Sequence, residues 1–179
     1  ELGYEINCRI GDHIGLRRLL LEAGAECGIR EFGFNALLSL RLEKGFGIWS
    51  AEFTQGYTPG MTGMDRWIDW EKDQFIGQSA ALKERDGNGP SQKLVMLEVE
   101  ASDADASGYE PVWNNDNLVG FVTSGGYGHT VNKSLAMALI NSDLAQEDQN
   151  LKVHVVGVEK DAKVIQMSPY DPEGSVMRV

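Results

Sequence analysis

The stretch Asp86-Gly87-Asn88-Gly89-Pro90, followed by the apolar run Leu94–Val99, decides how this chain is expected to fold. Clustered Gly, Asn and Pro residues favour turns and end helices, so the first stretch marks a boundary. The residues after it form short runs rich in branched apolar side chains, which are typical of strands. The sequence therefore predicts an α+β protein, with a mixed, helix-containing part over residues 1–90 and a small antiparallel β-barrel or sandwich over residues 91–179.

Four further runs continue the strand pattern after the boundary. The polar cluster Asn114–Asn117 precedes the first of them, and Glu159–Asp161 separates the last two. Short strands at nearly regular spacing favour a barrel or a sandwich. On this pattern we expect no helix longer than about ten residues within 91–160. The four runs are Leu118–Val122, Ser134–Ile140, Val153–Val158 and Lys163–Ile165.

Three helices are expected before the boundary. Asp12 is a good N-cap for the first of them, and Gly24 can take the left-handed conformation at its end. The alternating residues Ile6–Ile10 predict a strand ahead of this helix. The second and third helices are expected over Asn35–Lys44 and Gln78–Lys83.

The charge of the chain excludes some classes of partner. Its 179 residues include 16 Lys and Arg against 27 Asp and Glu, a formal net charge of −11. Nonspecific binding to nucleic acid or to an anionic membrane needs a basic face, so we expect neither partner. No apolar run reaches the roughly 18 residues of a spanning helix. Cys8 and Cys27 are too few for a disulfide scaffold and are expected to be buried thiols.

The common catalytic and cofactor motifs are absent from the sequence. It contains no GxGxxG turn, no GxxxxGK phosphate loop and no HExxH helix. The three histidines, His13, His129 and His154, are scattered, so no metal site is expected. The acidic run Asp65–Asp73 contains two tryptophans, which predicts a solvated face with buried aromatic rings; catalytic carboxylates are the alternative.

The glycines of Ser124–His129 surround Tyr127. Such a stretch permits tight turns and the close approach of another surface. It predicts a hairpin or bulge with a packed tyrosine, and a pocket wall or an interdomain contact is the alternative.

Six segments spread along the chain carry a resemblance to a known family. They are Glu1–Ile6, Ser39–Gly45, Thr58–Met64, Phe75–Leu82, Val122–Gly128 and Ser168–Pro172. In this order they resemble the folate-dependent aminomethyltransferases of the glycine cleavage T-protein superfamily, over essentially the whole chain. The Ala-Arg-Asp that usually precedes Leu40-Arg41 in T-proteins is absent here. The chain is therefore more similar to the C-terminal part of sarcosine and dimethylglycine dehydrogenases.

The resemblance implies a tetrahydrofolate-binding, one-carbon-transfer region of a flavin-dependent N-methylglycine dehydrogenase. Residues 1–90 would end a mixed α/β folate-binding subdomain, and residues 91–179 would form the C-terminal barrel. The chain would be a fragment without the flavin domain and the catalytic acid, so FAD would belong to the parent protein only and no turnover is expected. Its partners would be folate and the upstream domains. It would be cytoplasmic, or in the mitochondrial matrix of a eukaryote.

Two other interpretations stay open. The chain could come from a stand-alone folate-dependent aminomethyltransferase or demethylase, or from a noncatalytic, protein-binding member of the superfamily.

The resemblance carries over one ligand contact well. Glu5 matches the glutamate that contacts the pterin of tetrahydrofolate, and a carboxylate can accept the two adjacent N–H groups of a pterin. Arg41, Trp49 and Tyr127 are weaker candidates for folate contacts. Helix-end packing and surface ion pairs are the alternative for Arg41 and Glu43, and core or interdomain packing for the two aromatic residues. No catalytic residue is expected within this chain.

Overall fold

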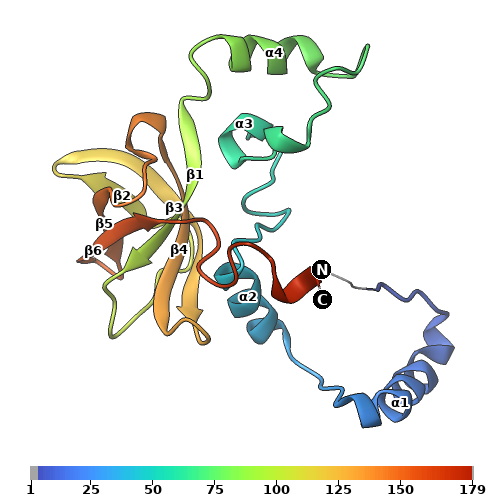
Figure 1. The fold of residues 1–179 in the computed structure, drawn as a ribbon. Helices are drawn as coiled ribbons and strands as arrows, with labels where there is room; N and C mark the ends of the chain where they lie inside the picture. The colour runs from blue at the N-terminus through green and yellow to red at the C-terminus, as the bar shows by residue number, and fades with distance from the viewer. Residues whose placement is uncertain (1–3, 179) are drawn as a thin grey trace.

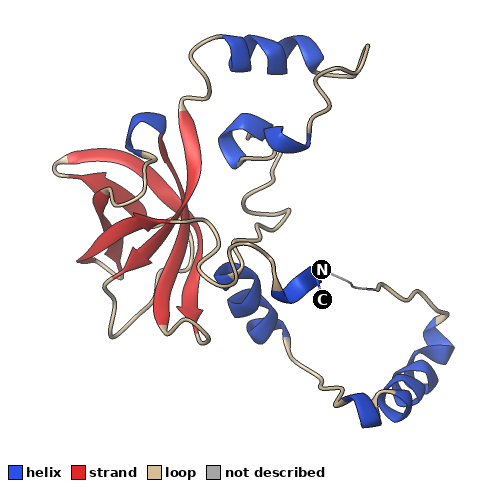
Figure 2. Ribbon diagram, in the orientation of Figure 1, coloured by secondary structure: helices blue, strands red, loops and turns tan. Residues whose placement is uncertain are grey.

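The computed structural model describes residues 4–178, so Glu1–Gly3 of the first family-like segment lie outside the described residues. The strands gather in one body, and the helices precede it in the chain (Figures 1 and 2). The expected helices are confirmed, each to within a few residues. The helices of a full turn or more are α1 (His13–Ala23), α2 (Phe34–Glu43), α3 (Pro59–Thr62) and α4 (Gln78–Asp86).

The strands form a closed, fully antiparallel barrel in the order β1-β4-β3-β2-β5-β6. Within residues 91–160, helical structure is limited to the single turn Ser142–Leu144. The predicted α+β class, with a small antiparallel barrel, is therefore confirmed. Closure gives every strand of the barrel a neighbouring strand on both sides. The strands are β1 (Gln92–Val99), β2 (Pro111–Asn114), β3 (Asn117–Gly128), β4 (Lys133–Asn141), β5 (Asn150–Val155) and β6 (Val158–Ile165).

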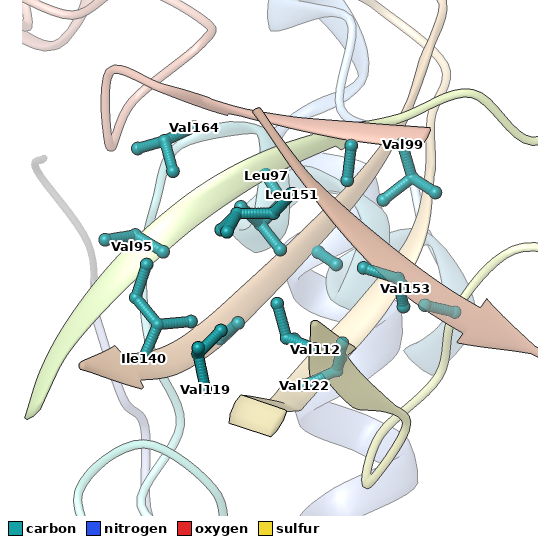
Figure 3. Close-up of a cluster of buried hydrophobic side chains, with 14 of the residues drawn as sticks. Val95, Leu97, Val99, Val112, Val119, Val122, Ile140, Leu151, Val153 and Val164 are labelled. Carbon is teal, nitrogen blue, oxygen red and sulfur yellow. The ribbon is translucent and has the colours of Figure 1, made fainter. Parts of the chain in front are cut away.

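The barrel is filled by side chains from every strand (Figure 3). Successive side chains of a strand point to opposite faces, so alternate residues of β1 and β4 enter the barrel. Val95 and Leu97 lie in this core, whereas Met96 between them packs outside with Leu135 and Met137 of β4 and with Leu42 of α2. Because both faces of β4 are covered, this strand reads as a continuous apolar run.

The structure corrects the prediction for the segment before α1. Residues 4–9 form no strand, and Ile10–Asp12 form a single 3-10 turn. A strand requires a neighbour to accept its backbone hydrogen bonds, and every strand of the described chain belongs to the barrel. Gly24 has right-handed dihedral angles, and Gly28 instead takes the left-handed conformation, with φ at +71°.

We call residues 4–33 the N-terminal arm. It runs away from the barrel before the chain returns at α2 (Figure 1). The main contacts of α1 are with the short turns at its two ends. Cys8 and Cys27 are therefore exposed, which contradicts the expected burial. Large apolar side chains of the arm are exposed as well: Tyr4, Ile6, Ile10, Ile14, Leu19, Leu20, Ile29 and Phe32.

A second correction concerns the strand predicted over Val153–Val158. This run is a two-residue hairpin, in which β5 ends at Val155 and β6 begins at Val158. Both turn residues have positive φ, +49° at Val156 and +76° at Gly157. The polar cluster Glu159–Asp161 therefore lies inside β6 rather than between strands. Glu159 and Asp161 are tolerated there because they lie on the outer, solvent-exposed face of the strand, and Lys160, on the opposite face, pairs with Asp103.

Replacing Val156 by Asn is expected to stabilise the protein. A left-handed conformation is unfavourable for a β-branched residue and costs about 1–2 kcal/mol for most L-residues, whereas Asn adopts it readily. Val156 is 83% exposed, so little packing would be lost. Denaturant unfolding of Val156→Asn should give a gain of about 0.5–1.5 kcal/mol. Val156→Ala is the matched control and should gain less; equal or lower stability of the Asn variant would contradict the argument.

Candidate functional site

The last turn of α2 is joined to the barrel by charged side chains. Glu43 is 2% exposed, and its carboxylate accepts hydrogen bonds from the backbone N–H groups of Thr130 and Val131. These two residues lie in the turn between β3 and β4. The carbonyl oxygen of Glu43 accepts a further bond from the N–H of Tyr170, 2.9 Å away. Glu43 is thus buried and holds two separate segments, which excludes the surface ion pair considered for it.

Lys44 binds the segment that follows the barrel. Its ammonium group donates to the carbonyl oxygen of Asp171 and, at 3.2 Å, to the carboxylate of the same residue. That carboxylate also accepts two bonds of 2.8 Å from Ser175, which lower the pKa of Asp171; Lys44 lowers it further, and partial burial opposes both. Gly45, at φ +72°, lets this segment approach, since a Cβ there would lie 2.1 Å from the carbonyl oxygen of Met167.

Arg41 and the fully buried Glu52 form the third connection. The guanidinium Nη1 lies 3.4 Å from a Glu52 carboxylate oxygen and 3.3 Å from the carbonyl oxygen of Phe46. The hydroxyl of Ser124 on β3 donates to the other oxygen of Glu52, and the N–H of Ile48 donates to the first at 2.9 Å. Burial lowers the pKa of Arg41, and the nearby Glu52 carboxylate opposes this effect. The guanidinium group therefore serves contacts within the protein.

Trp49 stands at the tip of a turn that Glu52 closes. The N–H groups of Ala51, Glu52 and Phe53 donate to the carbonyl oxygen of Ile48 at 3.0–3.3 Å. The side chain of Trp49 is 79% exposed, so it does not belong to the core of the described residues. An aromatic ring held open by a rigid turn is suited to contact a ligand or a partner.

Tyr127 lies on β3 beside α2. Its carbonyl oxygen accepts a 2.8 Å hydrogen bond from the hydroxyl of Ser39, and its ring meets the edge of His129 with centroids 5.1 Å apart. The residue is 38% exposed. A cavity of about 290 Å³ opens here between α2 and β3. The glycine-rich stretch thus lines a cavity, as the alternative of a pocket wall expected, and it also follows a bulge in β3 between Val122 and Ser124.

The structure places two of the four predicted site residues where α2 meets the barrel: Tyr127 is bound by Ser39, and Arg41 approaches Met137 of β4. Trp49 lies in the turn that follows α2. Glu5 lies apart from them, exposed in the N-terminal arm. The described contacts therefore place no common ligand pocket around all four residues.

The acidic run before α4 differs from its prediction. Trp67 is 75% exposed, and Arg66 lies 5.5 Å from the centre of its ring. Trp70 is half-buried, with Arg85 at 4.5 Å from its ring centre.

Among residues 4–178, no group of three or more His, Cys, Asp or Glu side chains is arranged to hold a metal ion. No helix within the same residues is long and apolar enough to cross a membrane.

Two parts of this chain match known domains. Residues 1–72 match the GCVT N-terminal domain, and residues 92–171 match the glycine cleavage T-protein C-terminal barrel domain. The chain belongs to the glycine cleavage T-protein family. The crystal structure of glycine cleavage system aminomethyltransferase T from Bartonella henselae is similar to it, with a TM-score of 0.78 and 26% identity. The match covers 89% of this chain and 45% of that chain.

Relatives of two kinds confirm the expected resemblance. The mitochondrial dimethylglycine dehydrogenase of Rattus norvegicus is 36% identical over 93% of this chain and 19% of its own length. The aminomethyltransferase of Geobacillus sp. (strain WCH70) is 33% identical over 92% of this chain and 45% of its own length. The chain thus spans less than half of either relative.

Several residues at the junction were not singled out as site residues from the sequence. Glu43, Lys44 and Asp171 lie in the segments that resemble the T-protein family, so the family pattern is the signal that marks them. Ser124 lies in one of these segments too, Val122–Gly128, but Glu52 is different. Glu52 lies outside those segments, and neither its charge nor its spacing indicates that it is fully buried.

Replacing Glu52 by Gln is expected to destabilise this T-protein family member by about 2–4 kcal/mol, because Arg41 would keep its buried charge without a carboxylate partner. Denaturant unfolding measures the effect. Glu98→Gln is the matched control, because Glu98 pairs with Lys133 at the surface and should contribute less than about 1 kcal/mol. Equal losses in the two variants would contradict the assigned role of Glu52.

The contribution of Asp171 should depend on pH. Its pKa is lowered in the folded protein, so its stabilising effect is complete above the unfolded value near 3.9 and is lost as the pH falls through the folded value. Wild type and Asp171→Asn should therefore differ in unfolding midpoint at pH 7 and converge toward pH 3. Asp116→Asn, in the exposed turn between β2 and β3, should match wild type throughout. A constant difference between wild type and Asp171→Asn would refute this linkage.

Proposed function

We propose that this chain is the tetrahydrofolate-binding, one-carbon-transfer region of a larger flavin-dependent enzyme that oxidises an N-methylglycine. The observation that carries the proposal is the order of the two matched domains, joined in one fold that resembles an aminomethyltransferase over 89% of this chain. Members of this family generally bind tetrahydrofolate. In the proposed enzyme, the upstream flavin domain would oxidise the methyl group, and this region would present the folate that receives the carbon.

The sequence around Arg41 supports the dehydrogenase type. Leu37 and Leu38 stand where T-proteins usually have Arg-Asp, and the rat dehydrogenase is slightly more similar to this chain than the bacterial aminomethyltransferase. The second candidate is a stand-alone aminomethyltransferase. Its support is that the bacterial aminomethyltransferase, at 33% identity, is nearly as similar to this chain as the dehydrogenase, at 36%. Translation of the parent reading frame separates the two candidates: a GxGxxG motif upstream supports the dehydrogenase, and a parent of about twice this length supports the transferase.

Glu5 is the proposed contact for the pterin. An ionised carboxylate accepts the ring N–H and the amino group side by side, and its exposure in the arm leaves both oxygens accessible. The open rings of Trp49 and Tyr127 are proposed to stack against folate. The contacts of Arg41 with Glu52 and Phe46 support a positioning role for Arg41, through the turn that carries Trp49.

The upstream domains are proposed to cover the N-terminal arm. Exposed apolar patches of this extent are unusual in a monomer and mark contact surfaces. The arm carries Glu5 among these apolar residues, so covering it would also build walls around the pterin contact. The division of the chain at residue 90 follows the same proposal, with the folate contact before it and the barrel after it.

In the full-length protein, Glu5→Gln is expected to weaken tetrahydrofolate binding. The change replaces one acceptor oxygen by a donor that faces another donor, at a cost of about 2–4 kcal/mol, or roughly 30- to 1000-fold in affinity. Reduction of the flavin by the amine should be nearly unchanged, because that step belongs to another domain. Titration of tetrahydrofolate, with flavin reduction rates alongside, measures both effects.

The matched control for this titration is Glu22→Gln, which removes an exposed carboxylate from the same arm. It should bind tetrahydrofolate like the wild type. Unchanged affinity in a folded Glu5→Gln variant would remove Glu5 from the site.

A further inference from the structure

The cavity between α2 and β3 has a distinct electrostatic character. Nine residues line it. Counting histidine as neutral, Asp105 is the one charged residue among these nine. Lys and Arg are absent from this lining. Asn35, Ser39 and His129 add oxygen and nitrogen atoms that can accept hydrogen bonds. The cavity therefore presents acceptors and a negative charge, which favours a cationic ligand and disfavours an anion.

The ring of Tyr127 forms an ordered wall of this cavity. Its backbone pairs with Ser134 in the barrel, and its carbonyl oxygen is bound by the hydroxyl of Ser39. The edge of His129 fixes the ring from one side at an angle of 73°. Because the residue is 38% exposed, part of the aromatic surface stays accessible. An aromatic face within about 6 Å attracts a cation through its quadrupole.

Two glycines give the cavity a surface without side chains. A Cβ on Gly125 would lie 2.3 Å from the carbonyl oxygen of Ala106, so this position excludes any larger residue. A Cβ on Gly126, at φ +157°, would meet only Leu42, at 3.9 Å. A side chain there would enter open space next to the cavity-lining Leu42. The backbone of Gly126 is thus accessible on the side of the cavity, whereas Gly125 lets β3 pack closely against Ala106.

We propose that this cavity binds a small organic ammonium ion, with the carboxylate of Asp105 as its counter-ion and the ring of Tyr127 against its alkyl groups. The volume of about 290 Å³ lies at the lower end of small-molecule sites and accommodates a methylated amine or an amino acid amine. The inference shares Tyr127 with the proposed folate contacts, whereas Glu5, the proposed pterin contact, lies in the N-terminal arm and does not line this cavity.

A titration of the ¹⁵N-labelled chain tests the proposal. Tetramethylammonium chloride is the probe, sodium chloride keeps the ionic strength constant, and tert-butanol is a neutral probe of similar shape. Amide resonances of Gly125, Gly126 and Tyr127 should shift with tetramethylammonium and saturate at millimolar concentrations. Tert-butanol should bind with at least about tenfold lower affinity, since it lacks the charge that Asp105 attracts.

Matched variants assign the effect to this cavity. Asp105→Asn should weaken binding of tetramethylammonium at least about tenfold. Asp103→Asn is the control, because Asp103 lies two residues away and pairs with Lys160 at the surface. Tyr127→Leu keeps the backbone bond to Ser39 and should weaken binding as well.

The dispersed barrel resonances report whether each variant is folded. Equal affinities for the two probes, or wild-type binding by a folded Asp105→Asn variant, would overturn the proposal, as would the absence of saturable shifts in the wild type.

Discussion

The structure depends on the attachment of one helix end to the barrel. Within four consecutive residues, Arg41–Lys44, α2 contacts the turn after β3, the buried Glu52 with Ser124, and the segment that follows β6. Burying such charges is costly unless they are paired. Orientations of the helix that break these pairs are therefore unfavourable. Leu42, in the middle of this run, adds the apolar contact with β1 and β4.

The closed barrel provides a rigid surface for this attachment. Its interior is filled by side chains from all strands, so the cavity beside Tyr127 lies outside the barrel, where α2 meets β3. The apolar outer face of β4 and the glycines of β3 decide how close the helix can come. The cavity beside Tyr127 and the exposed turn of Trp49 are consequences of the same close approach.

The N-terminal arm shows the opposite situation. Its helix α1 forms as local signals predict, yet the apolar side chains of the arm have no partner among the described residues that buries them. Apolar surface stabilises a fold only when it is removed from water. On the proposed function, that burial is supplied by the upstream part of the enzyme, and the carboxylate of Glu5 would then lie inside a shared site rather than on an open surface.

The sequence by itself determined the helices α1, α2 and α4, most barrel strands and the family, because caps, apolar alternation and ordered motifs are local signals. It was wrong where the outcome depends on a partner in space. Ile6–Ile10 alternates like a strand but has no neighbouring strand to pair with. Val156 and Gly157 form a hairpin turn, although the valines on either side of them, Val155 and Val158, favour strands. Only the tertiary structure decided that Glu52 is fully buried, because a carboxylate enters a core when distant groups such as Ser124 and Arg41 converge on it, and no local pattern records that convergence.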